Sequence, residues 1–167
     1  MEHVILIGMM GSGKTTIGRI ISRVTSRNFI DTDHLIEKKT GMSISDIINI
    51  KGEAYFRIVE KDVIMSLEPE APSVISTGGG AVMDDDIFSF LKKAGKTVYL
   101  KASPDVLYRR TTNAEVRPLL MHGDRLEIIQ RLLGKREPRY LESDIVIESG
   151  NRSPADIAED IIKRLHL

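Results

Sequence analysis

A glycine-rich stretch near the start of the chain carries the most specific chemical signal in the sequence. Residues 8–15 read Gly-Met-Met-Gly-Ser-Gly-Lys-Thr and directly follow an apolar run at residues 4–7. A strand leading into G-x-x-x-x-G-K-T forms a phosphate-binding loop, whose backbone N–H groups converge on phosphate oxygens at the positive end of the next helix. The motif predicts binding of ATP or GTP, with Lys14 at the β and γ phosphates. The predicted nucleotide contacts are Gly11, Ser12, Gly13, Lys14, Thr15 and Thr16.

Two carboxylates end the second apolar run, residues 29–30, and are the next candidates for chemistry. Asp31 and Asp33 are two residues apart, so both can face one side of a strand end. Near a nucleotide, Asp31 can hold Mg²⁺ through water together with the Thr15 hydroxyl, because Mg²⁺ prefers oxygen ligands. Asp33 can then orient a substrate hydroxyl and accept its proton. In an alternative interpretation, one of the two caps a helix that starts near His34, and one residue could serve both purposes.

A run of three glycines follows the third apolar run, residues 74–75. Gly78, Gly79 and Gly80 would let the backbone approach a ligand closely and donate N–H groups to its hydroxyls. A glycine run after a strand is also typical of a flexible turn, so this signal is weak by itself. Its position after a strand favours a role in substrate binding.

Three arginines could bind or stabilise anions. Arg57 lies near the start of a predicted helix, Arg136 precedes a Glu-Pro pair, and Arg117 lies in the aperiodic stretch 111–123. A guanidinium matches a carboxylate or phosphate with two parallel hydrogen bonds, so an anionic acceptor would explain Arg57 and Arg136. The stretch 111–123 is predicted to be a mobile lid, from which Arg117 would neutralise the transferring phosphoryl group. Each arginine taken singly could equally be a solvated surface residue.

Five short runs rich in β-branched residues supply the strands that must position these side chains. Segments with helical periodicity separate them, which is the pattern of an α/β protein with a parallel sheet. Ser103-Pro104 and Ser153-Pro154 each place a capping hydroxyl before a proline and mark helix starts. The loop 149–152 follows the last run and can border the nucleotide base. The predicted strand cores are residues 4–7, 29–30, 74–75, 98–100 and 145–147.

Length and composition fit one domain that spans residues 1–167. The 24 basic and 24 acidic residues balance, so the overall charge favours neither a nucleic acid nor an anionic membrane as partner. The chain has no cysteine, which excludes disulfides and thiolate metal sites and fits a reducing compartment. No stretch reaches the roughly 18 apolar residues that a membrane span needs. We therefore expect a soluble, cytoplasmic protein.

Taken in order, these motifs resemble the shikimate kinase family over nearly the whole chain. The resemblance rests on Gly-Met-Met-Gly-Ser-Gly-Lys-Thr, Phe-Ile-Asp-Thr-Asp, Gly-Glu-Ala-Tyr-Phe-Arg-x-x-Glu, Ser-Thr-Gly-Gly-Gly-Ala-Val, Val-Arg-Pro-Leu-Leu and Arg-Glu-Pro-x-Tyr. It implies a P-loop fold like that of nucleoside monophosphate kinases, with three layers, a mobile lid and a five-stranded parallel sheet in the order 2-3-1-4-5. It also implies transfer of the γ-phosphoryl of ATP, with Mg²⁺, to the 3-hydroxyl of shikimate in aromatic amino acid biosynthesis.

The resemblance further implies residue roles. The implied shikimate contacts are Asp33, Arg57, Gly79, Gly80 and Arg136, with Glu60 steadying Arg57. The implied nucleotide and metal contacts are Arg110 and the loop around Arg152 at adenine, Lys14 and Arg117 at the transferring phosphate, and Thr15 and Asp31 around Mg²⁺. The family also favours a monomer. The segment from Tyr140 to Asp144 is about a residue shorter than the family's usual spacing, which puts this helix-to-strand junction in doubt.

Two rival functions remain open. Another small-molecule kinase of the same fold, for gluconate or a nucleoside monophosphate, should lack the combination of Asp33, Arg57, the glycine run and Arg136. A nucleotide-gated binding module belongs to a different class. The guanine-recognition motif Asn-Lys-x-Asp is absent, and a kinase that has lost turnover should have lost Lys14, Asp33 or Arg117, all of which are present.

Overall fold

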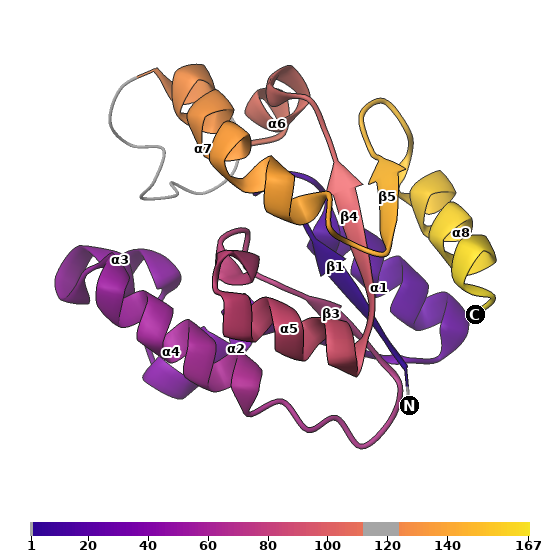
Figure 1. Cartoon of the computed structure of the whole chain (residues 1–167), viewed down its shortest axis with the longest axis horizontal. Coiled ribbons are helices and arrows are strands. Elements are labelled where there is room, and N and C mark those ends of the chain that lie inside the picture. Colours follow the sequence, from indigo (N-terminus) through magenta and orange to yellow (C-terminus); the bar gives the residue numbers. More distant parts are fainter. Residues whose placement is uncertain (1, 112–123) are drawn as a thin grey trace.

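A five-stranded parallel sheet forms the centre of the computed structural model, which describes residues 2–111 and 124–167 (Figure 1). The strand order is β2-β3-β1-β4-β5, and each neighbouring pair is parallel. The strands are β1 (His3–Ile7), β2 (Asn28–Asp31), β3 (Ser73–Ser76), β4 (Gly95–Lys101) and β5 (Ile145–Glu148). The predicted parallel sheet and its order are confirmed, and each predicted strand core lies inside an observed strand.

Helices connect the strands, and most of them begin at a side-chain cap. They are α1 (Lys14–Thr25), α2 (Thr32–Thr40), α3 (Ile44–Lys51), α4 (Glu53–Met65), the 3₁₀ turn η1 (Ala81–Met83), α5 (Asp85–Ala94), α6 (Pro104–Thr111), α7 (Arg125–Tyr140) and α8 (Pro154–Leu165). The Ser153 hydroxyl accepts the N–H of Asp156 at the start of α8, as its sequence predicts. Within the two described ranges, no helix is both long and apolar enough to cross a membrane.

Alternating side chains of the strands bury both faces of the sheet, which gives three layers. In β1, Val4 and Leu6 pack with residues of α1 and α8, whereas Ile5 and Ile7 pack with residues of α5, α6 and α7. Figure 1 shows α1 and α8 together on one side of the sheet, with α5 and α7 on the other. The carboxyl ends of all five strands consequently meet at one edge, where ligands of open α/β sheets bind.

A separate small core joins α2, α3 and α4 beside the sheet. Ile36, Ile47, Phe56 and Val63 are its buried members. These three helices lie together at one edge of the molecule (Figure 1), and α2 directly follows β2 in the chain. Because α4 is fixed through this core, the polar side chains on its other face have defined positions.

The helix-to-strand junction from Tyr140 to Asp144, which the sequence leaves in doubt, is tied to the central sheet. The Asp144 carboxylate accepts the backbone N–H of Thr97 at 2.8 Å and the Thr97 hydroxyl at 2.6 Å. Hydrogen bonds to Thr97 lower the pKa of Asp144 despite the opposing effect of burial. The shortened spacing therefore still lets β5 enter the sheet beside β4.

A buried histidine at the opposite edge of the sheet gives the fold a pH dependence. His3 Nδ1 accepts the backbone N–H of Ser73 at 3.1 Å, which requires a neutral ring. Burial lowers the pKa of His3 below its usual 6.5, and the charge of Arg27 lowers it further. Below pH 6.5 the unfolded chain therefore binds a proton that the folded chain resists, so stability falls as the pH decreases.

We expect His3→Asn to reduce this acid sensitivity, because the Asn Oδ1 can accept the same N–H without titrating. The measurement is the Tm of wild type and variant at pH 7.5 and pH 5.5. The Tm should fall more in wild type than in His3→Asn. Equal losses of Tm would mean that His3 does not cause the acid sensitivity of the fold.

Candidate active site

The phosphate-binding loop connects β1 to α1 and leaves the start of α1 open. Gly13 precedes α1 with φ +98°, a left-handed conformation that L side chains rarely adopt. Within the described part of the chain, no side chain caps α1, so the N–H groups of its first turn are available to an anion. Gly11 has φ +79°, and a Cβ atom there would lie 2.8 Å from the Thr111 side chain, so the loop packs closely on the end of α6.

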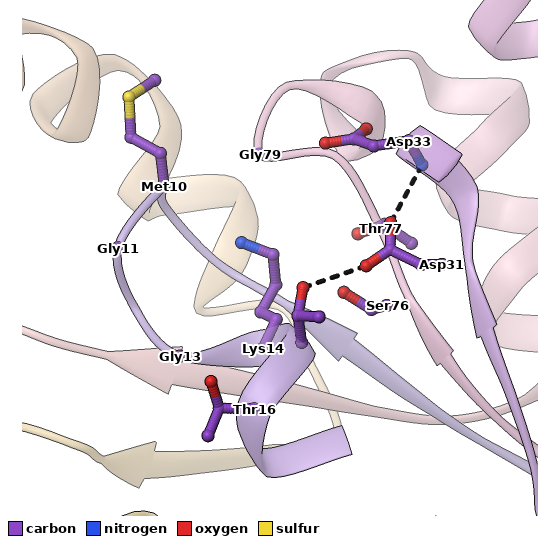
Figure 2. Close-up of a pocket in the computed structure, with 11 residues that line it drawn as sticks. Met10, Gly11, Gly13, Lys14, Thr16, Asp31, Asp33, Ser76, Thr77 and Gly79 are labelled. Atoms are coloured by element: carbon purple, nitrogen blue, oxygen red, sulfur yellow. Dashed lines mark hydrogen bonds between the residues drawn. The ribbon is translucent and has the colours of Figure 1, made fainter. Parts of the chain in front are cut away.

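The side chain of Lys14 folds over this loop. Its Nζ donates hydrogen bonds to the carbonyl oxygens of Gly8 at 2.8 Å and Met9 at 2.9 Å. Figure 2 shows the ammonium group beside the loop, among the residues that line the pocket. A phosphate that binds here therefore meets a cation already directed at its site.

Asp31 has two roles, one for each carboxylate oxygen. Its Oδ1 accepts the N–H groups of Asp33 at 3.1 Å and His34 at 3.4 Å and thereby caps α2. Its Oδ2 accepts the Thr15 hydroxyl at 2.9 Å. The expectation that one residue could serve as both cap and site residue fits this geometry, although α2 begins at Thr32, two residues before the predicted start.

The donor set at Thr15 and Asp31 fits Mg²⁺. In the described ranges there is no group of three or more His, Cys, Asp or Glu side chains that could hold a metal ion. Mg²⁺ at a phosphate site uses only one or two protein oxygens, because the phosphates and several waters complete its octahedron. A hydroxyl and a carboxylate oxygen 2.9 Å apart are therefore a suitable pair.

One pocket joins the phosphate loop, both carboxylates and the glycine run (Figure 2). The Asp33 carboxylate and Lys14 lie on different sides of this pocket. Met10, Ser76 and Thr77 also line it, although the sequence pattern assigns them no role; the position of Ser76 and Thr77 at the end of β3 is the signal that could have found them. The full lining is Met10, Gly11, Gly13, Lys14, Thr15, Thr16, Asp31, Asp33, Ser76, Thr77 and Gly79.

Arg57 lies on α4 and is held by two carboxylates of the same helix. Its Nη1 is 2.6 Å from Glu60 Oε2, and its Nη2 is 3.1 Å from Glu53 Oε1. Burial lowers the pKa of Arg57, but the two carboxylates outweigh it and raise the pKa above its usual value. The guanidinium therefore remains charged. Glu53 is a site residue that the sequence pattern did not single out, although its i,i+4 spacing from Arg57 is a usable signal.

Glu60 is an acidic side chain in the interior. Only 1% of the residue is exposed, and its Oε1 accepts no hydrogen bond from the described residues. Burial raises the pKa of Glu60, opposed by Arg57, and the nearby charge of Asp33 raises it further. The implied role of Glu60 in steadying Arg57 fits the contact between the two side chains.

The three glycines leave room for the charged groups. A Cβ atom on Gly78 would lie 2.6 Å from Glu60 Oε1 and 2.9 Å from Asp33 Oδ1, and one on Gly80 would lie 2.5 Å from Arg57 Nη2. The Gly78 N–H also donates to the Thr32 hydroxyl at 3.3 Å. Side chains on this run would displace the charged groups of the neighbouring residues. The run is therefore closely packed against the site and is more than a flexible turn.

Arg136 reaches the same run from α7. It is 7% exposed, its Nη1 is 3.8 Å from the Met9 sulfur, and a Cβ atom on Gly79 would lie 3.5 Å from this Nη1. The Tyr140 hydroxyl, one turn further along α7, donates to the Gly79 carbonyl oxygen. Burial raises the pKa of Tyr140 to about 12, so the hydroxyl keeps its proton. Arg57 and Arg136 thus approach the glycine run from different helices.

The remaining predicted residues divide into three cases. Arg110 Nη2 donates to the carbonyl oxygens of Ser149 and Gly150, both at 2.8 Å, and so lies against the loop that follows β5. Arg152, two residues beyond Gly150 in the same loop, pairs with Asp160 of α8 at 2.9 Å. Arg117 and almost all of the predicted lid, residues 111–123, lie outside the described residues. Thr111 is the exception, since it is buried and ends α6.

This fold and this pocket define a class of protein, the P-loop kinases that phosphorylate small molecules. A phosphate loop, a Mg²⁺-compatible oxygen pair and the Asp33 carboxylate share one pocket at the switch point of a parallel sheet. Arg57 and Arg136 lie against the glycine run that borders this pocket. Solved structures of distant kinases share the fold, among them a deoxyadenosine kinase from M. mycoides with bound dATP (13% identity, TM-score 0.63). A likeness at that identity shows the fold alone.

The chain belongs to the shikimate kinase family, because the family model for shikimate kinase matches residues 10–166. It is 40% identical to the shikimate kinase of Thermodesulfovibrio yellowstonii over 163 residues, covering 98% of this chain and 94% of that protein. It is 43% identical to the shikimate kinase of Nitrosococcus oceani over 164 residues, covering 98% and 86%. The structure of shikimate kinase from Acinetobacter baumannii in complex with shikimate has a TM-score of 0.95 at 35% identity, covering 99% and 93%. The family identifies the chain as an ATP-dependent kinase with Mg²⁺ as cofactor.

Proposed function

We propose that shikimate binds between the glycine run and the two arginines, with its 3-hydroxyl at Asp33 and its carboxylate on Arg57 and Arg136. The observation that carries the proposal is the shared pocket, which holds Asp33 and the phosphate loop together. A hydroxyl at Asp33 then lies in the same cavity as the phosphate it attacks. The backbone of Gly78, Gly79 and Gly80 can approach the acceptor closely because these residues carry no side chains. The space that a Cβ atom on Gly78 or Gly80 would fill is taken by charged groups of the site.

In the proposed step, Asp33 accepts the proton of the 3-hydroxyl as its O–H bond breaks. The new O–P bond forms to the γ-phosphorus, and the bond to the bridging oxygen of ADP breaks. Lys14 leaves the carbonyls of Gly8 and Met9 to bind the phosphates, which the N–H groups of Gly11, Ser12 and Gly13 also contact. Arg117 supplies further positive charge, and Thr16 completes the phosphate contacts.

Thr15 and Asp31 would hold Mg²⁺ through oxygen, which their 2.9 Å contact favours. When bound, Mg²⁺ neutralises charge on the β and γ phosphates. The adenine would lie beside Arg110 and the loop at Ser149, which are held together by hydrogen bonds from Arg110 to two carbonyl oxygens. Arg152, which is paired with Asp160, would border the base from the same loop.

Three broader properties belong to the same proposal. We propose that residues 1–167 act as one kinase domain with a lid near residues 111–123, that the enzyme is a monomer, and that it works in the cytoplasm without a nucleic acid or membrane partner. The balance of 24 basic and 24 acidic residues supports the absence of a polyanionic partner.

The proposed acceptor is tested by measuring ADP release from MgATP in a coupled assay. Shikimate, gluconate, AMP, CMP and no acceptor are compared at equal concentration. We expect saturable turnover with shikimate and only background with the others. Turnover with another acceptor would reject the assignment of the acceptor pocket while keeping the phosphate site. ATP binding without turnover would favour a non-catalytic binding module.

A further inference from the structure

The two carboxylates that hold Arg57 differ in how easily they can leave it. The Glu60 side chain is 1% exposed, whereas the Glu53 side chain is 52% exposed. Water can replace Arg57 as the partner of Glu53, and exposed ion pairs contribute little net stability. Glu60 has no such alternative. One arm of the guanidinium therefore has a buried partner, and the other has an exposed partner that water can replace.

The Nη2 arm is the one with the accessible partner. Nη1 is held by the buried Glu60, whereas Nη2 is held by Glu53, whose side chain is half exposed. Gly80 packs against both arms, since a Cβ atom there would lie 2.5 Å from Nη2 and 2.6 Å from Nη1. A ligand that pairs with Nη2 therefore has Glu53 as its competitor. A carboxylate binds arginine best through two parallel hydrogen bonds, so a ligand needs this arm.

We propose that Glu53 is a specificity-determining residue that competes with the acceptor's carboxylate for Arg57. The inference rests on the proposed function, in which Arg57 binds that carboxylate. In the free enzyme Glu53 occupies the Nη2 arm, and the acceptor displaces it. The apparent affinity is then reduced by the fraction of molecules in which the arm is occupied.

This competition favours acceptors that carry a full negative charge. A carboxylate that replaces Glu53 exchanges one ion pair for another, with the gain of a second parallel hydrogen bond. A neutral polyol has no charge with which to displace Glu53, so it meets an arginine that is already paired. The internal carboxylate thus excludes neutral analogues that would otherwise fit the same pocket.

The alternative role for Glu53 predicts the opposite result. If Glu53 only steadies Arg57, as Glu60 does from the buried side, its removal loosens the guanidinium and raises the KM for shikimate. If it competes, its removal lowers that KM. The sign of the change therefore separates competition from positioning.

The test is Glu53→Gln, which keeps the length of the side chain and removes its charge. We expect the KM for shikimate to fall about two- to fivefold, with kcat and the KM for ATP unchanged, because an exposed pair contributes only this much. The matched control is Glu159→Gln, which removes an exposed carboxylate paired with Lys163 at the same i,i+4 spacing on the remote helix α8. It should change none of these constants. The Tm of each variant checks that the fold is intact.

A KM for shikimate that is unchanged or raised in Glu53→Gln would overturn the inference. Arg57→Gln, measured in parallel, separates this from failure of the proposed function. A raised KM in Arg57→Gln without a fall in Glu53→Gln rejects the competition alone. An unchanged KM in Arg57→Gln rejects the proposed role of Arg57, and the competition with it.

Discussion

Replacing Asp33 with Asn is expected to lower kcat by a factor of about 10² to 10⁴ while the KM for ATP stays close to its wild-type value. The amide has nearly the shape of the carboxylate but cannot accept the hydroxyl proton. The substitution also removes a negative charge from the pocket that Asp33 shares with Lys14. ATP binding depends on the phosphate loop and should persist. Steady-state kinetics with each substrate varied in turn measures the effect.

The matched control for this variant is Asp156→Asn. Asp156 also lies in the first turn of a helix, but on α8, away from the pocket, where it contacts the capping Ser153 hydroxyl. It should leave kcat unchanged. An Asp33→Asn enzyme with a kcat within a few-fold of wild type would show that Asp33 is not the proton acceptor.

Gly80→Ala is expected to raise the KM for shikimate about 10- to 100-fold, because the new methyl group and the Arg57 guanidinium cannot occupy the same space. The Cβ atom would lie 2.5 to 2.8 Å from Nη2, Nη1 and Cζ of Arg57. Arginine side chains are flexible, but this one is fixed by the buried Glu60. The guanidinium must therefore shift away from its binding position. The KM for ATP should change little.

Gly134→Ala controls for the general effect of adding a methyl group. Gly134 lies in α7, and a Cβ atom there would meet nothing within 4 Å. This variant should keep both KM values and gain stability of about 1 kcal/mol, since alanine favours helix over glycine. If Gly80→Ala folds with a normal Tm and keeps the wild-type KM for shikimate, then Arg57 does not bind the acceptor in this position.

The sequence was sufficient to predict the sheet and the place of the glycine-rich loop between β1 and α1, because both depend on local patterns. The loop at residues 8–15 has a fixed spacing, and strands interleaved with helices allow few arrangements of a parallel sheet. Asp31 could be placed at a strand end for the same reason, whereas Asp33 lies in the first turn of α2 and not on the strand that the i,i+2 spacing assumed. The sequence could not predict that Asp31 is the residue that caps α2. That role depends on the orientation of its carboxylate, in which Oδ1 faces the N–H groups at the start of the helix.

The acceptor half depends on contacts between residues that are distant in sequence. Nothing local indicates that Tyr140 bonds Gly79, 61 residues away, or that Arg136 approaches Met9. The pairing of Arg152 with Asp160 on α8 is another contact that the motifs did not indicate, and the predicted position of Arg152 beside adenine stays a prediction. Such pairings follow from tertiary packing, which periodicity and motifs do not encode.

The two sets of hydrogen bonds made by Asp31 mean that this proposed metal ligand is oriented before any nucleotide arrives. Because Oδ1 is bonded to the start of α2, the rotamer that presents Oδ2 to Thr15 is selected when the helix forms. The conformational entropy of this side chain is thus lost during folding and not during catalysis. At Asp31, the folding of α2 and the preorganisation of the site therefore occur together. A substitution that keeps the helix cap but lacks a second carboxylate oxygen would leave Thr15 without its partner at the proposed metal site.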